Sequence, residues 1–486
     1  MSENNSIVNK LNSLQDATKA MEPLGQDLDD LTQKVINHGH QFLRKINDLD
    51  AYKSDEGYGD QLAGTEFNEE GYDIDKLLKV VAKDVDGPGI QPASGGHLGY
   101  IPGGGVYPSA LGDYLAAVAN KYAGVYYASP GAVQLENQVI RWIAKMIGFP
   151  EPAHGNLTSG GSIANLIGIV TARDMKGISS DKIKKSCIYL TKQAHHSLHK
   201  AIRIAGLGEA VLREIDVDER FRLDLSYLKS QVQSDIEYGL TPFMVIGSAG
   251  TTDTGAIDPL DDIATLCKEY NLWFHIDAAY GGFFVLVNEL KKKLKGIEKA
   301  DSVTIDPHKG LFLAYGLGAV IIKDVTAMKQ SHYYRANYMQ DVTEIEAEPS
   351  PADLSPELTK HFRGLRMWLP LQLFGVKVFR QALEEKVLLC QYFYQKIQEI
   401  GFEVGPEPEL SVCIYRYTQG VDNPNKFNDQ LIKAVQEHGR IFISSTTIDG
   451  TYWLRLAVMS FRTHLNTINE LLGILEQKKD ELISNK

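Results

Sequence analysis

The ten residues 303–312, Val-Thr-Ile-Asp-Pro-His-Lys-Gly-Leu-Phe, constrain the fold and chemistry of this chain more than any other stretch. The first three are β-branched and predict a short buried strand. Pro307 has no N–H for a sheet, so the strand ends before it and Lys309 follows on a turn closed by Gly310. Sites in open α/β sheets lie at the carboxyl ends of strands. A partly desolvated lysine there is suited to forming a Schiff base with a carbonyl group, although a surface lysine after a strand has the same pattern.

A second strand with a polar end lies upstream of the lysine. The largely apolar run 272–276 ends in Asp277, and small residues follow it. A buried carboxylate is unfavourable unless it meets a cation, and the protonated nitrogen of a pyridine ring is such a cation. The charged segment 287–296 predicts a helix between Asp277 and Lys309. Both residues therefore belong to one β-α-β unit and emerge from the same edge of a parallel sheet.

The simplest interpretation of this pair is a site for pyridoxal 5'-phosphate (PLP). In it, Lys309 holds the cofactor aldehyde and Asp277 keeps the ring nitrogen protonated. The alternative for Asp277 is the N-cap of a helix. A binding protein that had lost catalysis would have no reason to retain both residues, so an enzyme is expected.

The segments 275–282 (His-Ile-Asp-Ala-Ala-Tyr-Gly-Gly) and 306–309 (Asp-Pro-His-Lys) resemble the group II PLP-dependent decarboxylases, which include aromatic-L-amino-acid, histidine, glutamate and tyrosine decarboxylases. The pattern can be followed over about residues 85–460. The resemblance implies an α/β, fold-type I enzyme with a mostly parallel seven-stranded sheet flanked by helices. It also implies decarboxylation of an L-amino acid to the amine and CO2, in a homodimer with a shared active site. A PLP-dependent aldehyde synthase, which adds oxidative deamination, is the alternative.

Three regions are expected, because 486 residues are too many for one small core. Residues 1–90 are a polar helical segment that lacks the capacity for its own core, and the resemblance implies that it packs across the dimer. Residues 91–375 form the large PLP-binding domain. Residues 376–486 form a small C-terminal α+β domain.

Charge, cysteine and hydropathy patterns exclude several classes of protein. The net charge is −12 and no strongly basic run occurs, which argues against a nucleic-acid partner. The four cysteines are widely spaced without a Cys-x-x-Cys motif, so neither a metal cluster nor a disulfide framework is expected. No 18-residue apolar run and no signal-peptide core occur, so we expect a cytoplasmic protein without a membrane partner.

The segment 156–165, Asn-Leu-Thr-Ser-Gly-Gly-Ser-Ile-Ala-Asn, opens a helix that is expected to run to about residue 176. Glycines let backbone N–H groups approach a phosphate, and the helix N-terminus carries partial positive charge. Gly161 and Ser162 are therefore the predicted phosphate cradle, with ordinary helix capping as the alternative.

The resemblance implies further cofactor contacts. His195 of Gln-Ala-His is expected to stack on the pyridine ring and contact the substrate carboxylate, with His196 as the alternative. Thr252 is expected beside the cofactor, although its hydroxyl is equally suited to a turn bond. Asp306 and His308 match positions near the phosphate; because an acid is unfavourable beside a dianion, Asp306 is expected to donate its backbone N–H or to orient its neighbours. The complete predicted cofactor set is Gly161, Ser162, His195, Thr252, Asp277, Ala279, Asp306, His308 and Lys309.

The resemblance also implies a substrate side formed by Tyr100, Pro102 and Gly103 of a glycine-rich passage, with Arg363 supporting the site. Two positions depart from the aromatic-acid enzymes. Ile101 stands where an aromatic residue is common, and Gly103 stands where a threonine is common. An aromatic L-amino acid is favoured as substrate, and an acidic or aliphatic one stays open.

The polar stretch 329–358 is long for a segment with little regular pattern, which indicates a functional loop. The resemblance implies a mobile loop here whose tyrosine protonates the reaction intermediate. Tyr338 is the match, and Tyr333 and Tyr334 are the alternatives. The predicted catalytic set is Lys309, His195, Tyr338 and Asp277, and no metal is expected.

Overall fold

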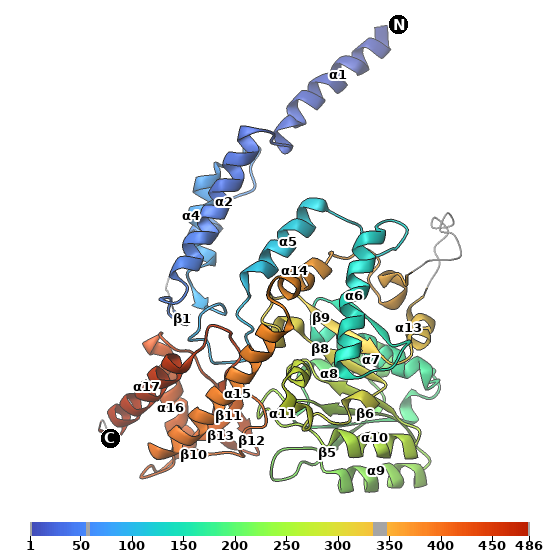
Figure 1. Ribbon diagram of the computed structural model, residues 1–486, viewed down its shortest axis with the longest axis vertical. Helices are drawn as coiled ribbons and strands as arrows, with labels where there is room; N and C mark the ends of the chain where they lie inside the picture. Colours follow the sequence, from blue (N-terminus) through green and yellow to red (C-terminus); the bar gives the residue numbers. More distant parts are fainter. Residues whose placement is uncertain (1, 55–58, 334–347, 485–486) are drawn as a thin grey trace. The chain divides into compact units, whose positions relative to one another are not determined.

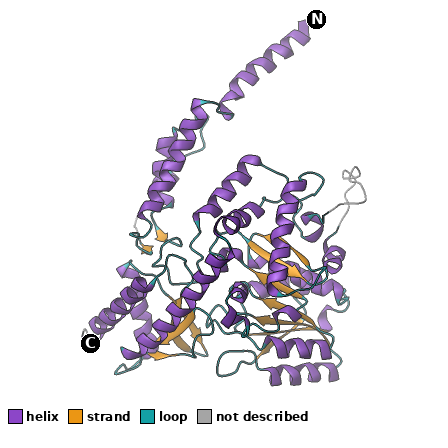
Figure 2. Cartoon of the chain, in the orientation of Figure 1, coloured by secondary structure: helices purple, strands orange, loops and turns teal. Residues whose placement is uncertain are grey.

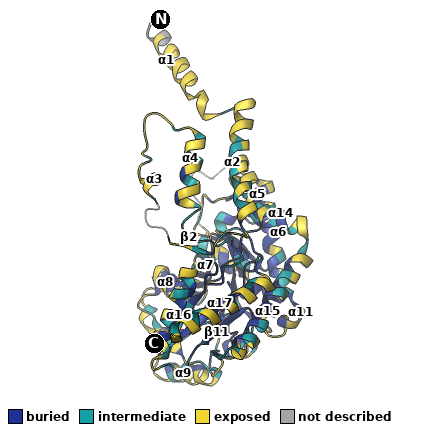
Figure 3. Cartoon of the chain, turned by 90° about the vertical axis from the view of Figure 1, so that its left-hand side faces the viewer, coloured by how far each residue is buried: buried dark blue, intermediate teal, exposed yellow. Residues whose placement is uncertain are grey.

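The computed structural model describes residues 2–54, 59–333 and 348–484, and it divides the chain into two compact units, 1–91 and 92–486 (Figure 1). The first unit is mainly helical, as the sequence predicts. Its helix α2 has no buried side chain, and Figure 3 shows α1 and α2 exposed along most of their length. The elements of this unit are α1 (Ser2–Thr18), α2 (Gln26–Lys45), β1 (Tyr52–Lys53), α3 (Asp60–Ala63), α4 (Ile74–Val80) and β2 (Gly89–Ile90).

The second unit is built on a seven-stranded sheet with the strand order β3-β9-β8-β7-β6-β4-β5 (Figure 2). Strand β9 is antiparallel to both of its neighbours, and the other pairs are parallel. The expected fold, a mostly parallel seven-stranded sheet, is therefore confirmed. The strands are β3 (His154–Thr158), β4 (Ser186–Thr191), β5 (Val211–Ile215), β6 (Thr241–Ser248), β7 (Trp273–Asp277), β8 (Ser302–Ile305) and β9 (Gly318–Ile322).

Helices cover both faces of this sheet, because successive strand residues point to opposite sides. On one side Tyr189, Val245 and Phe274 pack with α6 (Pro130–Ile147), α9 (Leu225–Glu237) and α10 (Leu260–Glu269). On the other side Leu190 and Trp273 pack with α7 (Gly161–Met175), α8 (His196–Ile202) and α13 (Val325–His332). The polar residues of β7 that alternate with Phe274 therefore face α7.

The C-terminal part carries a separate antiparallel sheet of order β10-β11-β13-β12 with its own apolar core. Its two central strands are β11 and β13, and the mixture of strands and helices agrees with the α+β character predicted for this part. Gly375 (φ 71°) separates α14 from α15 at the predicted boundary between the large and small domains, which stays a prediction. The elements are α14 (Gly364–Phe374), α15 (Val376–Glu399), β10 (Glu403–Val404), β11 (Val412–Arg416), α16 (Pro424–His438), β12 (Ser444–Ile448), β13 (Thr451–Ala457) and α17 (Leu465–Ser484).

The connection from β7 to β8 differs from its prediction. The strands are parallel neighbours as expected, but the helix predicted over 287–296 is reduced to α11 (Asn288–Lys291). The helix ends at Lys291, and Gly296 (φ 102°) at the end of the predicted range lies outside the helical region of backbone conformation. A Cβ at Gly296 would lie 2.3 Å from the backbone nitrogen of Asp261, which explains the glycine there. The predicted turn at the lysine is a single helical turn, α12 (Pro307–Gly310). Within the described ranges, no helix has the length and apolar character needed to cross a bilayer.

Candidate active site

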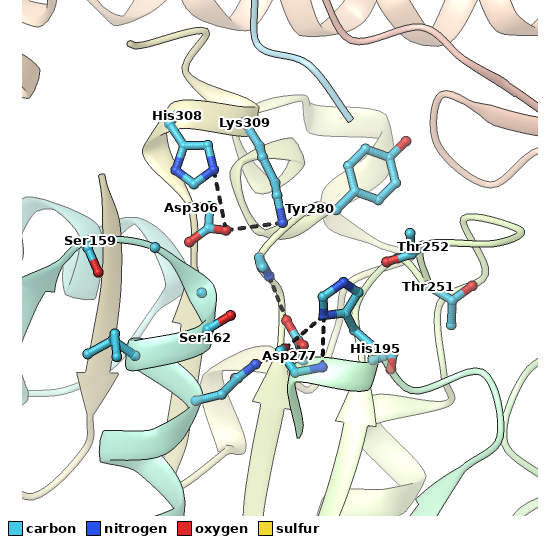
Figure 4. Close-up of a pocket in the computed structure, with 18 of the residues that line it drawn as sticks. Ser159, Ser162, His195, Thr251, Thr252, Asp277, Tyr280, Asp306, His308 and Lys309 are labelled. Atoms are coloured by element: carbon cyan, nitrogen blue, oxygen red, sulfur yellow. Dashed lines mark hydrogen bonds and ion pairs between the residues drawn. The ribbon is translucent and has the colours of Figure 1, made fainter. Parts of the chain in front are cut away.

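A cavity of ≈ 350 Å³ opens at the carboxyl ends of β6, β7 and β8 (Figure 4). Its wall also includes the start of α7 and the loop before α8. All nine residues of the predicted cofactor set lie on this wall, although they come from separate elements of the chain. The further lining residues, which the sequence did not single out, are Ser159, Gly160, Ile163, Asn165, Gln193, Ser197, Ser248, Gly250, Thr251 and Tyr280.

Lys309 enters the cavity from α12, and its Nζ lies 3.1 Å from Oδ2 of Asp306. The side chain of Asp306 is 2% exposed. Its backbone N–H donates to the carbonyl of Ala279 at 3.3 Å, so this N–H has a partner within the protein. Of the two roles expected for Asp306, the geometry favours the one in which it orients its neighbours.

His308 is held by the backbone on its far side. Its Nδ1–H donates to the carbonyl of Leu317 at 2.6 Å. Burial lowers the pKa of His308, which favours the neutral ring. The other ring nitrogen then carries no proton, and it faces Oδ2 of Asp306 at 3.8 Å, beyond hydrogen-bond distance.

Asp277 ends β7 and is buried with two donors in place. Its Oδ1 accepts the backbone N–H of Ala279 at 3.1 Å, and its Oδ2 accepts Nδ2–H of Asn165 at 3.1 Å. The helix N-cap alternative is therefore not what the structure shows, since the next helical turn begins after Gly281. A carboxylate accepts about four hydrogen bonds, so Asp277 keeps capacity for a donor in the cavity.

His195 is the N-cap of α8 and lies on the cavity wall, whereas its neighbour His196 is exposed. The backbone N–H of Ser197 donates to Nδ1 of His195 at 3.3 Å, and Oγ of Ser197 lies 2.7 Å from the same nitrogen. Burial lowers the pKa of His195. A neutral ring that accepts at Nδ1 carries its proton on Nε2, which makes Nε2 a donor.

The N-terminus of α7 forms another part of the wall. Gly160 precedes it and no side chain caps it. A Cβ on Gly161 would lie 3.0 Å from Oδ2 of Asp306 and 3.3 Å from Cβ of Ala279, so a side chain there would crowd both residues. Gly161 and Ser162 line the cavity at the first turn of α7, which has no side-chain cap, and such a helix start is suited to binding an anion.

The predicted substrate residues lie outside the cavity wall that the described residues form. Arg363 is buried in a two-bond ion pair with Glu357, at 3.0 Å for each bond. Tyr100 (φ 50°) is 56% exposed. A Cβ on Gly103 would lie 2.2 Å from the carbonyl oxygen of His308, which explains why this position has no side chain. The substrate contacts of Tyr100, Pro102, Gly103 and Arg363 stay predictions.

The predicted proton donor Tyr338 and its alternative Tyr334 lie outside the described residues. Tyr333 is described: it follows α13 and is 54% exposed. The choice among the three tyrosines stays a prediction.

Sequence comparisons identify one family, and a comparison with solved structures identifies the same fold. The family model described as "Pyridoxal-dependent decarboxylase conserved domain" matches residues 57–418. The aromatic-L-amino-acid decarboxylase of Bacillus atrophaeus is 33% identical, over 85% of this chain and 86% of the relative. The phenylacetaldehyde synthase of Petunia hybrida is 29% identical, over 79% and 80%. The crystal structure of Oryza sativa TDC with PLP and tryptamine superposes with a TM-score of 0.89 at 22% identity, over 95% of this chain and 99% of that one.

The residues present fit PLP. A lysine amine, a buried carboxylate with spare acceptor capacity and a glycine-lined helix N-terminus share one cavity, as the aldehyde, ring nitrogen and phosphate of PLP require. Oε1 of Gln193 and Oδ1 of Asp306, both on lining residues, are buried without a partner among the described residues. A wall with such unpaired acceptors is suited to a polar group rather than an apolar one.

Proposed function

Because the chain belongs to the pyridoxal-dependent decarboxylases, we propose that it converts an aromatic L-amino acid to the corresponding amine and CO2. The observation that carries this proposal is the presence of Lys309 and Asp277 on the wall of one cavity at adjacent strand ends (Figure 4). In a parallel sheet, neighbouring strand ends are the usual place for a shared site.

PLP, when bound, supplies the electron sink that accepts the electron pair left by the departing CO2. Lys309 is the amine that would hold the cofactor aldehyde. Asp277 would hold a proton on the ring nitrogen, and the start of α7 would hold the phosphate. His195 presents its Nε2–H for the substrate carboxylate, which orients the bond that breaks.

The aromatic class is supported by the charges of the cavity. Among the described lining residues, Lys309 is the one lysine or arginine, and it is assigned to the cofactor. The side chain of an acidic substrate needs a further cation to offset its desolvation, whereas an aromatic side chain does not. The similarity to the aromatic-L-amino-acid decarboxylase of Bacillus atrophaeus agrees with this choice.

The second candidate is an aldehyde synthase, which the similarity to the Petunia hybrida phenylacetaldehyde synthase favours. Both reactions begin with loss of CO2. They differ in the next step, because protonation of the carbanion gives the amine, whereas its reaction with oxygen leads to aldehyde, ammonia and peroxide. A tyrosine at position 338 is a competent proton donor, and this favours the amine.

We also propose a homodimer in which the first unit packs across the partner. Helix α5 (Tyr107–Ala119) exposes Leu111, Leu115 and Val118 at 39%, 48% and 67%, and these form one stripe at helical spacing. Such a stripe is typical of an interaction surface. Light scattering should give twice the mass of one chain. A cytoplasmic location is supported by four free, buried cysteines, as expected in a reducing compartment.

The decisive experiment is CO2 release from the PLP-loaded protein over a panel of L-amino acids, aromatic, acidic, aliphatic and non-protein ones included. The products are then assayed for amine and for aldehyde, ammonia and peroxide. We expect CO2 from an aromatic member of the panel together with an equal amount of amine. Release from glutamate or aspartate analogues alone would overturn the aromatic assignment, and aldehyde with peroxide would establish the second candidate.

A further inference from the structure

A continuous line of buried polar side chains leads to Asp277 from inside the sheet. Trp273, His275 and Asp277 alternate along β7 and point to the same face. Ser302 of β8 is the register partner of His275, and Asn165 lies one turn into α7, which covers this face. All five side chains are 9% exposed or less.

Four hydrogen bonds join these side chains in series. Nε1–H of Trp273 donates to Oγ of Ser302 at 2.8 Å. Oγ of Ser302 lies 2.7 Å from Nδ1 of His275, and Nε2 of His275 lies 2.9 Å from Oδ1 of Asn165. Nδ2–H of Asn165 then donates to Oδ2 of Asp277 at 3.1 Å.

The chemistry of the groups fixes the direction of every bond. An ionised Asp277 only accepts, so Asn165 must turn its NH2 group toward it and its Oδ1 toward His275. Burial lowers the pKa of His275 to about 4, so the ring is neutral and its single proton lies on Nε2. Nδ1 then accepts the hydroxyl proton of Ser302, and that hydroxyl accepts from Trp273. All donors therefore point toward the carboxylate, and the chain polarises in its favour.

The other tautomer of His275 would place an acceptor, rather than a donor, against the carboxylate of Asp277. If the ring proton moved to Nδ1, Nε2 would accept, and Asn165 would have to present its oxygen to the carboxylate of Asp277. The ring has little freedom to avoid this choice, because α7 packs directly on it. A Cβ on Gly168 would lie 2.8 Å from Cε1 of His275 and 2.9 Å from its Nδ1. The tautomer of His275 therefore decides whether Asn165 presents a donor or an acceptor to Asp277.

We propose that His275, with Ser302 and Asn165, is a positioning residue that keeps the acceptor oxygens of Asp277 aimed at the ring nitrogen of PLP. This inference rests on the assignment of Asp277 in the proposed function. His275 acts through Asn165 and Asp277. As a result, the ring nitrogen of the bound cofactor should stay protonated at neutral and mildly alkaline pH.

The test follows the protonation of the cofactor rather than turnover. Holoenzyme is reconstituted with PLP carrying 15N at the ring nitrogen, whose NMR shift separates the protonated from the neutral ring. His275→Leu removes the donor to Asn165, whereas His275→Gln retains an N–H at that end of the side chain. Asn165→Leu removes the amide that joins His275 to Asp277 without adding a charge. Thr171→Val is the control, because Thr171 is equally buried on α7 and donates to the carbonyl of Ile167.

We expect the ring nitrogen of His275→Leu and Asn165→Leu to lose its proton at least about one pH unit earlier than in the wild type, a tenfold loss of proton affinity. His275→Gln should lie closer to the wild type, and Thr171→Val should match it. If His275→Leu folds poorly, Asn165→Leu tests the same link. This inference is overturned if the ring nitrogen titrates as in the wild type in both His275→Leu and Asn165→Leu. It is also overturned if His275→Leu and His275→Gln lose equal proton affinity at the ring nitrogen.

The variant Asp277→Asn distinguishes failure of this inference from failure of the proposed role of Asp277. We expect that variant to lose the protonated signal. A retained signal would mean that Asp277 is not the partner of the ring nitrogen, so the proposed role of Asp277 would be wrong. If Asp277→Asn loses the protonated signal and the variants of His275 and Asn165 do not change it, the proposed role of Asp277 is retained. Only the positioning role of His275 would then be wrong.

Discussion

Nζ of Lys309 lies 3.1 Å from Oδ2 of Asp306, three positions earlier in the sequence, and the carboxylate is almost fully buried. The single helical turn of α12 brings them together, because residues three apart lie on the same side of a helix. Asp306 thereby holds the amine at the cavity rather than in solvent.

This geometry predicts where PLP attaches. Borohydride reduction of the loaded protein should abolish its visible absorption and fix the cofactor on the peptide that contains Lys309. Peptide mass spectrometry identifies the labelled residue. Lys309→Ala should carry no label under the same conditions, and label on another lysine in the wild type would contradict the assignment.

Asp277→Asn should retain PLP, because the phosphate and Lys309 still hold it, but the ring nitrogen loses its anionic partner. A charge-assisted contact of this kind that strengthens in the transition state is worth about 3 kcal/mol or more. The rate of CO2 release should therefore fall at least about a hundredfold. Near wild-type single-turnover rates in a variant with full PLP occupancy would refute the role.

Tyr338→Phe should separate loss of CO2 from protonation. This variant should bind PLP and substrate and still release CO2, but its product should shift from amine toward aldehyde and ammonia. The matched control is Tyr333→Phe, since Tyr333 is exposed at the end of α13. If the control loses amine yield and Tyr338→Phe does not, the role belongs to Tyr333.

Gly103→Ala should destabilise the protein, because its Cβ would lie 2.2 Å from the carbonyl oxygen of His308 and force α12 to move. Overpacking of this kind costs about 1–3 kcal/mol. Gly473→Ala is the control, since a Cβ there meets nothing within 4 Å and lies inside α17. It should stabilise by about 0.5–1 kcal/mol. Urea unfolding measures both, and equal effects would contradict the close approach at Gly103.

The buried carboxyl group of Asp258 makes the free energy of unfolding depend on pH. Burial raises the pKa of this carboxyl from its ordinary 3.8 to about 6, although the backbone N–H groups of Leu223 and Ser248 donate to it. The folded state therefore binds the proton more tightly than the unfolded state. Asp258 lowers the free energy of unfolding as pH rises from about 4 to about 6, by up to about 3 kcal/mol, and adds no further change above that range.

Asp258→Asn should remove this dependence. Buried histidines whose pKa is lowered, such as His154 and His275, act with the opposite sign, so the measurement is the difference between variant and wild type. Denaturant unfolding at several pH values gives that difference. We expect the deficit of the variant to be larger near pH 4 than above pH 6, and a constant deficit would contradict the raised pKa.

The pair of motifs around Asp277 and Lys309 indicated the cofactor, and the family resemblance that these motifs carry implied the fold class and the residues of the cofactor wall. Such motifs are local: each is a strand that ends in a functional side chain, and parallel strands bring those ends to one edge. The predicted cofactor residues consequently line one cavity. Helix 287–296 was predicted over too long a range, because a run of charged residues does not mark where a helix ends, and α11 ends at Lys291.

Tertiary structure alone decided the second layer of the site. The sequence does not distinguish Asn165, because an asparagine inside a helix has no local signal of its own. Its offset of four from Gly161 nevertheless places it one helical turn after the predicted phosphate cradle. His275 was read as part of a strand, and its bonds to Ser302 and Asn165 join three separate elements. Sequence determines which groups stand at the strand ends, whereas the packing of α7 on β7 and β8 decides which proton each buried group carries, because only packing chooses its partners.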